Sequence, residues 1–142
     1  MVVGICSRYY QAGTETTFDK ISGLLRMSTK YQIDDLRNEI ISHLAVAYPM
    51  TLQKYQATVD PKATMRLFPP FEGQHFAVAS LAIETGTSAV LPTALWRSTC
   101  ELAERIDKGV AGQNGTRYQL PLIYRLSCLR VKLTLHLVYM RL

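Results

Sequence analysis

The stretch "LLRMSTKYQIDDLRNEIISHL", residues 24–44, holds the end of one periodic apolar run, a short break, and the start of a second run. Apolar side chains recur every three or four residues on both sides of the break, which is typical of amphipathic helices. We predict helices over residues 17–30 and 34–48, with Asp34 as the N-cap of the second and Pro49 directly after its end. The stretch therefore predicts a helical hairpin.

The corner of this hairpin carries three side chains that invite a functional interpretation. A cation at Lys30 suits the negative end of the first helix. Tyr31 can pack its ring while its hydroxyl reaches water or a carbonyl. Arg37 can lay its apolar stem along the outside of the second helix. We interpret the corner as structural, with direct contact to a partner by Tyr31 or Arg37 as the alternative.

The rest of the chain up to Gly109 predicts more helix, separated by proline and glycine. Further helices are expected near residues 51–57, 72–86 and 92–108, with Gly86 and Gly109 as stops. The expected fold is all-α, with antiparallel helical hairpins packed as a small irregular bundle. The expected core includes Leu25, Leu36, Ile40, Phe76, Leu95 and Leu102.

We expect a helical region over residues 14–109, followed by a linker and a basic, leucine-rich tail over 110–142 that is not an independent domain. The glycine-rich start of this tail predicts a flexible connector. Its leucines fit two periods: one subset is spaced by three and four, as in a helix, and another alternates, as in a strand. The spacing alone leaves both open. The helical subset is Leu122, Leu126, Leu129, Leu133, His136 and Met140.

Charge divides the 142-residue chain unevenly. Residues 1–107 hold ten lysines and arginines against all eleven acids, a net charge of −1. Residues 108–142 hold six basic side chains and no acid, a net charge of +6. Any acidic partner therefore concerns the tail, where Arg125, Arg130 and Lys132 are the candidate contacts.

The residue types that carry catalysis or bind metals are scattered. The three histidines and three cysteines lie far apart in the sequence, and no nucleotide-binding or hydrolase motif is present. We therefore expect no enzyme activity, no cofactor, no metal site and no small-molecule substrate. An odd number of dispersed cysteines, with no apolar leader at the start, predicts reduced thiols in the cytoplasm or nucleus.

Two segments together resemble a known family. In the first, Lys-Tyr between two helices is followed by Leu-Arg and then by a Tyr-Pro-x-Thr-Leu segment; in the second, Leu-Pro precedes Ala-Leu and an aromatic residue. This arrangement resembles the distal part of the BTB/POZ domain in the form found in fungal proteins. The matching residues are Lys30, Tyr31, Ile33, Leu36, Arg37, Leu44, Tyr48, Pro49, Thr51, Leu52, Leu91, Pro92, Ala94, Leu95 and Trp96. A weaker resemblance to the same family covers Leu120, Cys128, Leu129, Lys132 and Leu133, with Val131 where the family has glycine.

The resemblance implies a non-catalytic protein–protein interaction module, scaffold-like or adaptor-like. It also implies that the chain lacks the strand-rich first half of the BTB fold, as a truncated relative would. Apolar surface near Leu24 and Ile41 would then be uncovered, and the chain would bind a protein partner or itself. The alternative, from the charge of residues 108–142, is a basic module that contacts nucleic acid or an anionic membrane.

Overall fold

The computed structural model describes residues 16–58, 68–112 and 115–140, and it confirms the all-α prediction. Its helices are α2 (Phe18–Lys30), α3 (Asp34–Ala47), α4 (Leu52–Thr58), α5 (Gln74–Thr85), α6 (Leu91–Thr99), α7 (Ala103–Lys108) and α8 (Leu122–Met140). A small antiparallel pair joins β1 (Val110–Ala111) to β2 (Arg117–Tyr118). Cys6 and the start of the helical region expected at residue 14 lie outside the described residues.

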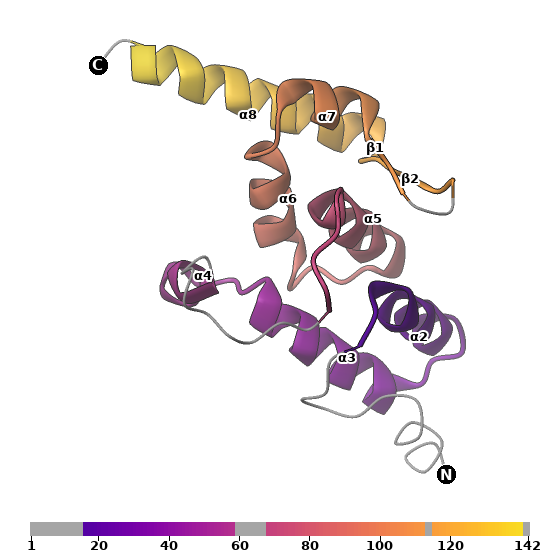
Figure 1. Ribbon diagram of the computed structural model, residues 1–142. Helices are drawn as coiled ribbons and strands as arrows, with labels where there is room; N and C mark the ends of the chain where they lie inside the picture. Colours follow the sequence, from indigo (N-terminus) through magenta and orange to yellow (C-terminus); the bar gives the residue numbers. More distant parts are fainter. Residues whose placement is uncertain (1–15, 59–67, 113–114, 141–142) are drawn as a thin grey trace.

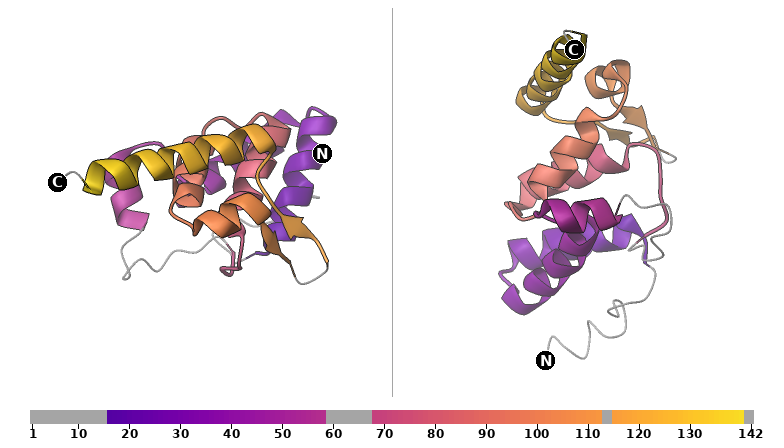
Figure 2. Two further views of the ribbon diagram at one scale, coloured as in Figure 1. Left: turned by 90° about the horizontal axis from the view of Figure 1, so that it is seen from above. Right: turned by 90° about the vertical axis from the view of Figure 1, so that its left-hand side faces the viewer.

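The helices stack as three successive pairs, α2 with α3, α5 with α6, and α7 with α8 (Figure 1). The middle pair lies between the other two, and two further views show the same order (Figure 2). Helix α5 is buried on most of its sides, as expected for a helix with neighbours all round. Its buried residues are Phe76, Ala77, Val78, Ala79, Leu81, Ala82 and Thr85. The core therefore runs through the centre of the stack.

The hairpin of α2 and α3 forms where it was predicted, with one difference at its corner. The Thr17 hydroxyl accepts a hydrogen bond from the Lys20 backbone N–H (3.3 Å) and caps α2. Asp34 is not the N-cap of α3: that position belongs to Ile33, and no side chain caps this end. Gln32 turns the corner with φ of 57°, so the chain enters α3 one residue earlier than the polar side chains indicated.

The single helix predicted over residues 92–108 is wrong, because the chain breaks between α6 and α7. The hydroxyls of Ser98 and Thr99 bond back to the carbonyls of Ala94 (2.8 Å) and Leu95 (2.9 Å), a pattern that weakens or bends helices. The freed Thr99 carbonyl accepts a hydrogen bond from Lys132 Nζ (3.3 Å) on α8. A hydrogen bond from a residue distant in sequence thus satisfies the carbonyl at the end of α6.

The expected core is confirmed at four of its six positions. Leu25, Leu36, Ile40 and Phe76 are at most 3% exposed. Leu95 is half-buried and packs against the core cluster. Leu102 does not belong to the core: it is 69% exposed, because the break at its own position makes it the N-cap of α7.

The segment expected to be a flexible connector contains the β1–β2 pair instead. Val110 pairs with Tyr118, and Ala111 pairs with Arg117. Gly109 ends α7 with φ of 76°, and a Cβ there would lie 2.7 Å from the Tyr118 carbonyl oxygen, so only glycine fits without a shift. The tail that follows is helical rather than extended, since α8 runs through residues 122–140.

Candidate functional site: the groove beside α8

The first part of α8 is tied to the helices beneath it. Cys128 is buried and belongs to the core cluster. Arg125 Nη1 donates a hydrogen bond to the Asp107 carbonyl in α7 (3.0 Å), and Lys132 Nζ donates to the Thr99 carbonyl in α6. Both cations therefore satisfy carbonyls at helix C-termini, where positive charge is favourable.

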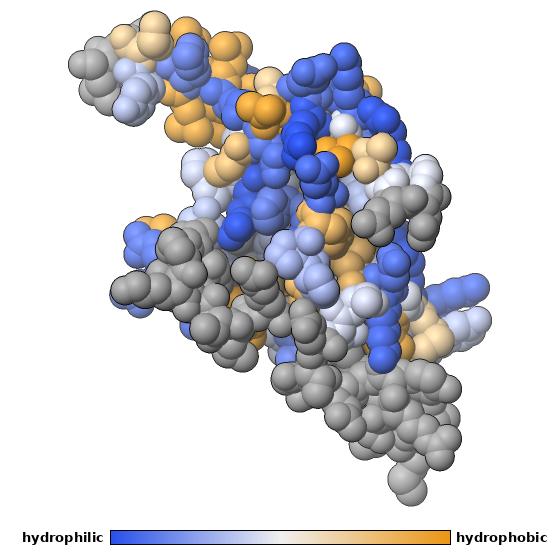
Figure 3. Space-filling view, in the orientation of Figure 1, coloured by the Kyte–Doolittle hydropathy of each residue, from blue (hydrophilic) through white to orange (hydrophobic). Residues whose placement is uncertain are grey.

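From Leu133 onward every residue of α8 that the structure describes is exposed. This part of the helix projects past the stack, at the upper left of Figure 1, and the space-filling view shows apolar surface along it (Figure 3). The exposed large apolar side chains of α8 are Leu122, Ile123, Leu126, Val131, Leu133, Leu135, Leu137, Val138, Tyr139 and Met140. A run of this size on one helix is typical of an interaction surface rather than of a monomer's solvent face.

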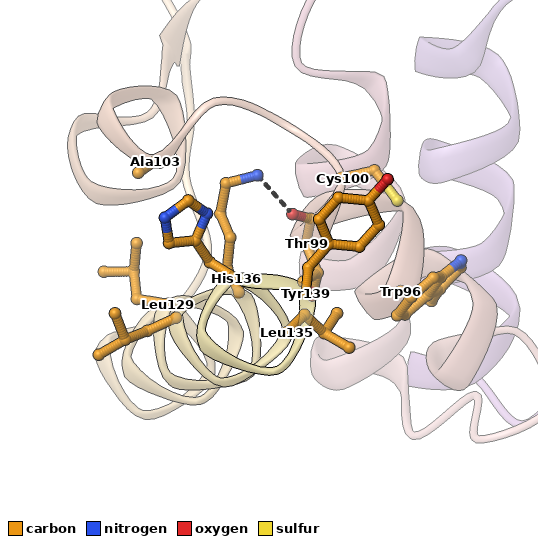
Figure 4. Close-up of a pocket in the computed structure, with 10 residues that line it drawn as sticks. Trp96, Thr99, Cys100, Ala103, Leu129, Leu135, His136 and Tyr139 are labelled. Atoms are coloured by element: carbon orange, nitrogen blue, oxygen red, sulfur yellow. Dashed lines mark hydrogen bonds between the residues drawn. The ribbon is translucent and has the colours of Figure 1, made fainter. Parts of the chain in front are cut away.

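An open groove of about 560 Å³ separates the projecting part of α8 from α6 and the start of α7. Its lining residues are Trp96, Thr99, Cys100 and Ala103 on one side and Leu129, Lys132, Leu133, Leu135, His136 and Tyr139 on α8. Figure 4 shows the Lys132–Thr99 hydrogen bond between the two walls, with Trp96 at one end and Leu129 at the other. We call this feature the α8 groove.

Trp96 forms one rim of the α8 groove. Its Nε1 donates a hydrogen bond to the Tyr55 hydroxyl (3.1 Å), which links α6 to α4 and fixes the indole. The side chain is still 44% exposed. It is the chain's single tryptophan, so its fluorescence reports on this rim alone. A fixed, half-exposed aromatic ring is the kind of group that dominates binding at protein interfaces.

One stripe of side chains runs along α8, and three of its members, Leu129, Leu133 and His136, line the groove. Its side chains are spaced by four and three residues, the average period of 3.5 that lets two helices pack along a seam. The stripe consists of Leu122, Leu126, Leu129, Leu133, His136 and Met140, and all but the half-buried Leu129 are exposed. Of the two alternatives for the tail, the helical one is correct. Among the described residues, no helix covers the exposed members of this stripe.

The five residues proposed as partner contacts fall into two separate places. Arg125, Arg130 and Lys132 lie on α8, and of these only Arg130 makes no side-chain hydrogen bond or ion pair within the described part of the chain. Tyr31 and Arg37 lie at the α2–α3 corner, at the other end of the stack (Figure 1). The structure therefore brings three of the five together.

At the corner, Tyr31 and Arg37 differ in exposure and in what they contact. Tyr31 is 64% exposed, with the Lys30 ammonium 5.4 Å from its ring centroid. Arg37 is half-buried: its Nε donates to the Thr29 hydroxyl (3.3 Å) and its Nη2 to the Thr85 carbonyl (3.0 Å). Arg37 thus joins α3 to the C-terminal ends of α2 and α5, a structural role, and it does not lie along the outside as expected.

Sequence reasoning missed the groove residues outside the tail, above all Trp96 and Cys100. It also placed the uncovered apolar surface elsewhere: Leu24 and Ile41 are half-buried and pack against the core. The signal that could have found the groove is the heptad-like spacing in the tail combined with the aromatic residue on α6. Without the break after Thr99, however, the two walls could not be placed together.

A polar cluster that contains titratable groups lies at the N-terminal end of α5. Gln74 Nε2 donates to the Tyr48 hydroxyl (3.0 Å), which lies 2.9 Å from His75 Nδ1. Burial raises the pKa of Tyr48 to about 12, so the hydroxyl keeps its proton and can donate it to a neutral His75. Burial, with a smaller effect from the positive charge of Arg97, lowers the pKa of His75 to about 4. The cluster joins α3 to α5 and does not open onto the α8 groove.

The side chains that could act as nucleophiles or as metal ligands are dispersed. Cys100 and His136 both line the α8 groove, but their side chains lie on different sides of Thr99 and Tyr139 in Figure 4. Within residues 16–58, 68–112 and 115–140, no group of three or more His, Cys, Asp or Glu side chains could hold a metal ion. Among the helices described, none is both long and apolar enough to cross a membrane.

Comparisons with family models, with curated proteins and with solved structures find no match to this chain.

Proposed function

We propose that this chain is a non-catalytic protein–protein interaction module that binds its partner along α8. The observation that carries the proposal is the exposed apolar stripe of α8, part of which lines a groove with Trp96 on its rim. Ordered apolar surface of this kind gains about 25 cal/mol for every Å² that a partner covers. The BTB/POZ-like segments quoted above are consistent with such a role and extend the proposal to a scaffold-like or adaptor-like relative of that family.

The alternative, a basic module for nucleic acid or anionic membranes, has less support from the contacts of its cations. Of the six bases in residues 108–142, four make intramolecular contacts: Lys108 with Glu104, Arg117 with the Lys108 carbonyl, Arg125 with Asp107 and Lys132 with Thr99. Phosphate contacts would have to compete with these hydrogen bonds. Arg130 is free to bind, and Arg141 lies outside the described residues.

A matched pair of variants tests the proposal. Leu133→Glu places a charge on the stripe, whereas Thr134→Glu places the same charge at the next residue, on another side of α8. Tagged full-length chains are used for affinity capture from a cell extract, and captured proteins are quantified by mass spectrometry. We expect proteins that wild type and Thr134→Glu retain and that Leu133→Glu loses at least tenfold.

Two results would count against this function. In one, no captured protein depends on Leu133. In the other, the purified chain binds duplex DNA or anionic vesicles at moderate salt and Leu133→Glu leaves that binding unchanged. Binding to DNA through at most six phosphate contacts would show a log–log salt slope no steeper than roughly −5.

A further inference from the structure

We infer that the α8 groove takes an acidic amphipathic helix from another protein, an inference that rests on the proposed interaction function and adds the chemical class of the partner. Three properties of the groove carry it: the spacing of the apolar stripe, the sign of the charge beside it, and the concave shape between α8 and α6.

The spacing identifies the form of the partner. The stripe alternates steps of four and three residues over the 19 residues from Leu122 to Met140, which lie about 27 Å apart along the axis at 1.5 Å per residue. Side chains at this period interlock with those of a second helix and do not match the two-residue repeat of a strand. One wall of the groove is α8 and the other is α6 with the start of α7, so an inserted helix would pack between them.

The charge identifies the composition of the partner. Lys132 lines the groove, Arg130 is exposed nearby on α8, and α8 contains no acid. The acids closest in sequence to the opposite wall are already paired: Glu101 lies 3.7 Å from Arg105, and Glu104 lies 3.2 Å from Lys108. A partner with Asp or Glu beside its apolar residues would meet uncompensated positive charge.

The same charges argue against a second copy of this chain. Two α8 helices packed along their stripes would bring Arg125, Arg130 and Lys132 of each copy together, with no acid on either helix to pair with them. Like charges beside a helix–helix seam disfavour that pairing.

The shape argues against a lipid surface. The stripe passes into the α8 groove, where Trp96, Thr99 and Ala103 form the wall opposite Leu129 and Leu133. A flat bilayer cannot follow the surface between these two walls, whereas the side chains of a helix can enter it.

The experiment selects partners without assuming their sequence. A displayed library of 21-residue helical peptides has leucine or isoleucine at heptad positions a and d, and Glu and Lys in equal numbers at the flanking positions. The library is selected on the full-length chain, and binders to Leu133→Glu are removed. Recovered peptides are then titrated against the wild type, with the shift of the Trp96 emission maximum as the readout and with Thr134→Glu as the matched control.

We expect Glu to exceed Lys at the flanking positions of recovered peptides by at least threefold. We also expect a blue shift of Trp96 on binding, and binding that is at least tenfold weaker to Leu133→Glu and within twofold of wild type for Thr134→Glu. Arg130→Gln should weaken binding a few-fold and flatten its salt dependence.

Other outcomes overturn the inference in distinguishable ways. Equal or greater recovery of Lys-flanked peptides shows that the partner is not acidic and leaves the proposed function standing. Recovery of no helical peptide, with concentration-dependent dimers that Leu133→Glu abolishes, assigns the groove to a second copy. Recovery of no peptide and no dimer, with capture from extract that still depends on Leu133, assigns a non-helical partner. Absence of all three removes the proposed function as well.

Discussion

Helices α3 and α8 are both rich in leucine and isoleucine, yet they use these residues differently. Helix α3 buries Leu36, Ile40 and Leu44 on one side, with Arg37 and Ile41 half-buried beside them. Helix α8 buries only Cys128 among its described residues, and its leucines surround the helix on several sides. Apolar content alone does not fix where a helix lies. Its distribution around the axis, and the number of neighbours available, decide how much of it is covered.

The largest expected difference between the two helices is in the unfolding free energy lost when one leucine of each is truncated to alanine. Leu36 is 3% exposed and Leu126 is 59% exposed. Leu36→Ala should cost about 2–5 kcal/mol of unfolding free energy, because it removes buried contacts and leaves a cavity. Leu126→Ala should cost less than about 0.5 kcal/mol in a denaturant titration of the same chain. Equal losses would mean that α8 is covered in solution.

The next effect concerns arginine on the two helices. Arg37 bonds Thr29 and Thr85, while the Arg130 side chain makes no hydrogen bond among the residues described. Arg37→Ala leaves the Thr85 carbonyl without that donor, so a loss of about 1–3 kcal/mol is expected. Arg130→Ala should change the unfolding free energy by less than about 0.5 kcal/mol. A small loss at Arg37 would show that its contacts with α2 and α5 are not made in solution.

The predictability of the fold differs between the same two regions. The α2–α3 hairpin could be predicted because its signals are local: the periodic apolar residues, Thr17 at the start and Pro49 after the end all act within a few residues of their own position. The helical repeat of α8 was also visible, but a second, alternating subset of leucines left it unresolved. Periodicity in a short leucine-rich run cannot decide between helix and strand.

The α8 groove could not be predicted, for a reason that lies in long-range contacts. Its walls meet because the chain breaks after Thr99, and Lys132, 33 residues later, satisfies the freed carbonyl. The residues around Cys100 have no proline or glycine to mark the break. Arg37 was missed in the same way, since its acceptor Thr85 lies 48 residues away. Only features with local sequence signals were recovered.

A smaller effect separates half-buried His75, which bonds Tyr48 at the end of α3, from exposed His136 on α8. The pKa of His75 is about 4 in the folded chain, below its ordinary value of 6.5, so the unfolded state binds more protons between these values. Stability should therefore be complete above pH 6.5, fall as the pH drops, and reach its full loss below pH 4. Allowing for partial exposure, we expect a loss of about 1–2 kcal/mol.

The variant His75→Gln should remove this pH-dependent part of the unfolding free energy, because an amide can accept the Tyr48 hydrogen bond without titrating. His136→Gln should keep it, and the difference between variant and wild type is measured by urea titration from pH 7 to pH 4. A His136→Gln chain that loses the pH dependence would place the titrating group on α8 and reverse the assignment.

The smallest expected effect is the change in unfolding free energy of Leu133→Glu and Thr134→Glu, the two variants used in the binding experiments. Leu133 is 59% exposed and Thr134 is exposed, so replacing either with glutamate buries no charge. Each glutamate lies in the second half of α8, where a negative charge is mildly unfavourable, and each is within one turn of Arg130. These terms are small and opposed, and each variant should unfold within about 0.5 kcal/mol of wild type in urea. If Leu133→Glu instead loses about 2 kcal/mol or more while Thr134→Glu does not, the stripe is already covered by the chain itself. The groove would then be part of the core rather than a surface for a partner.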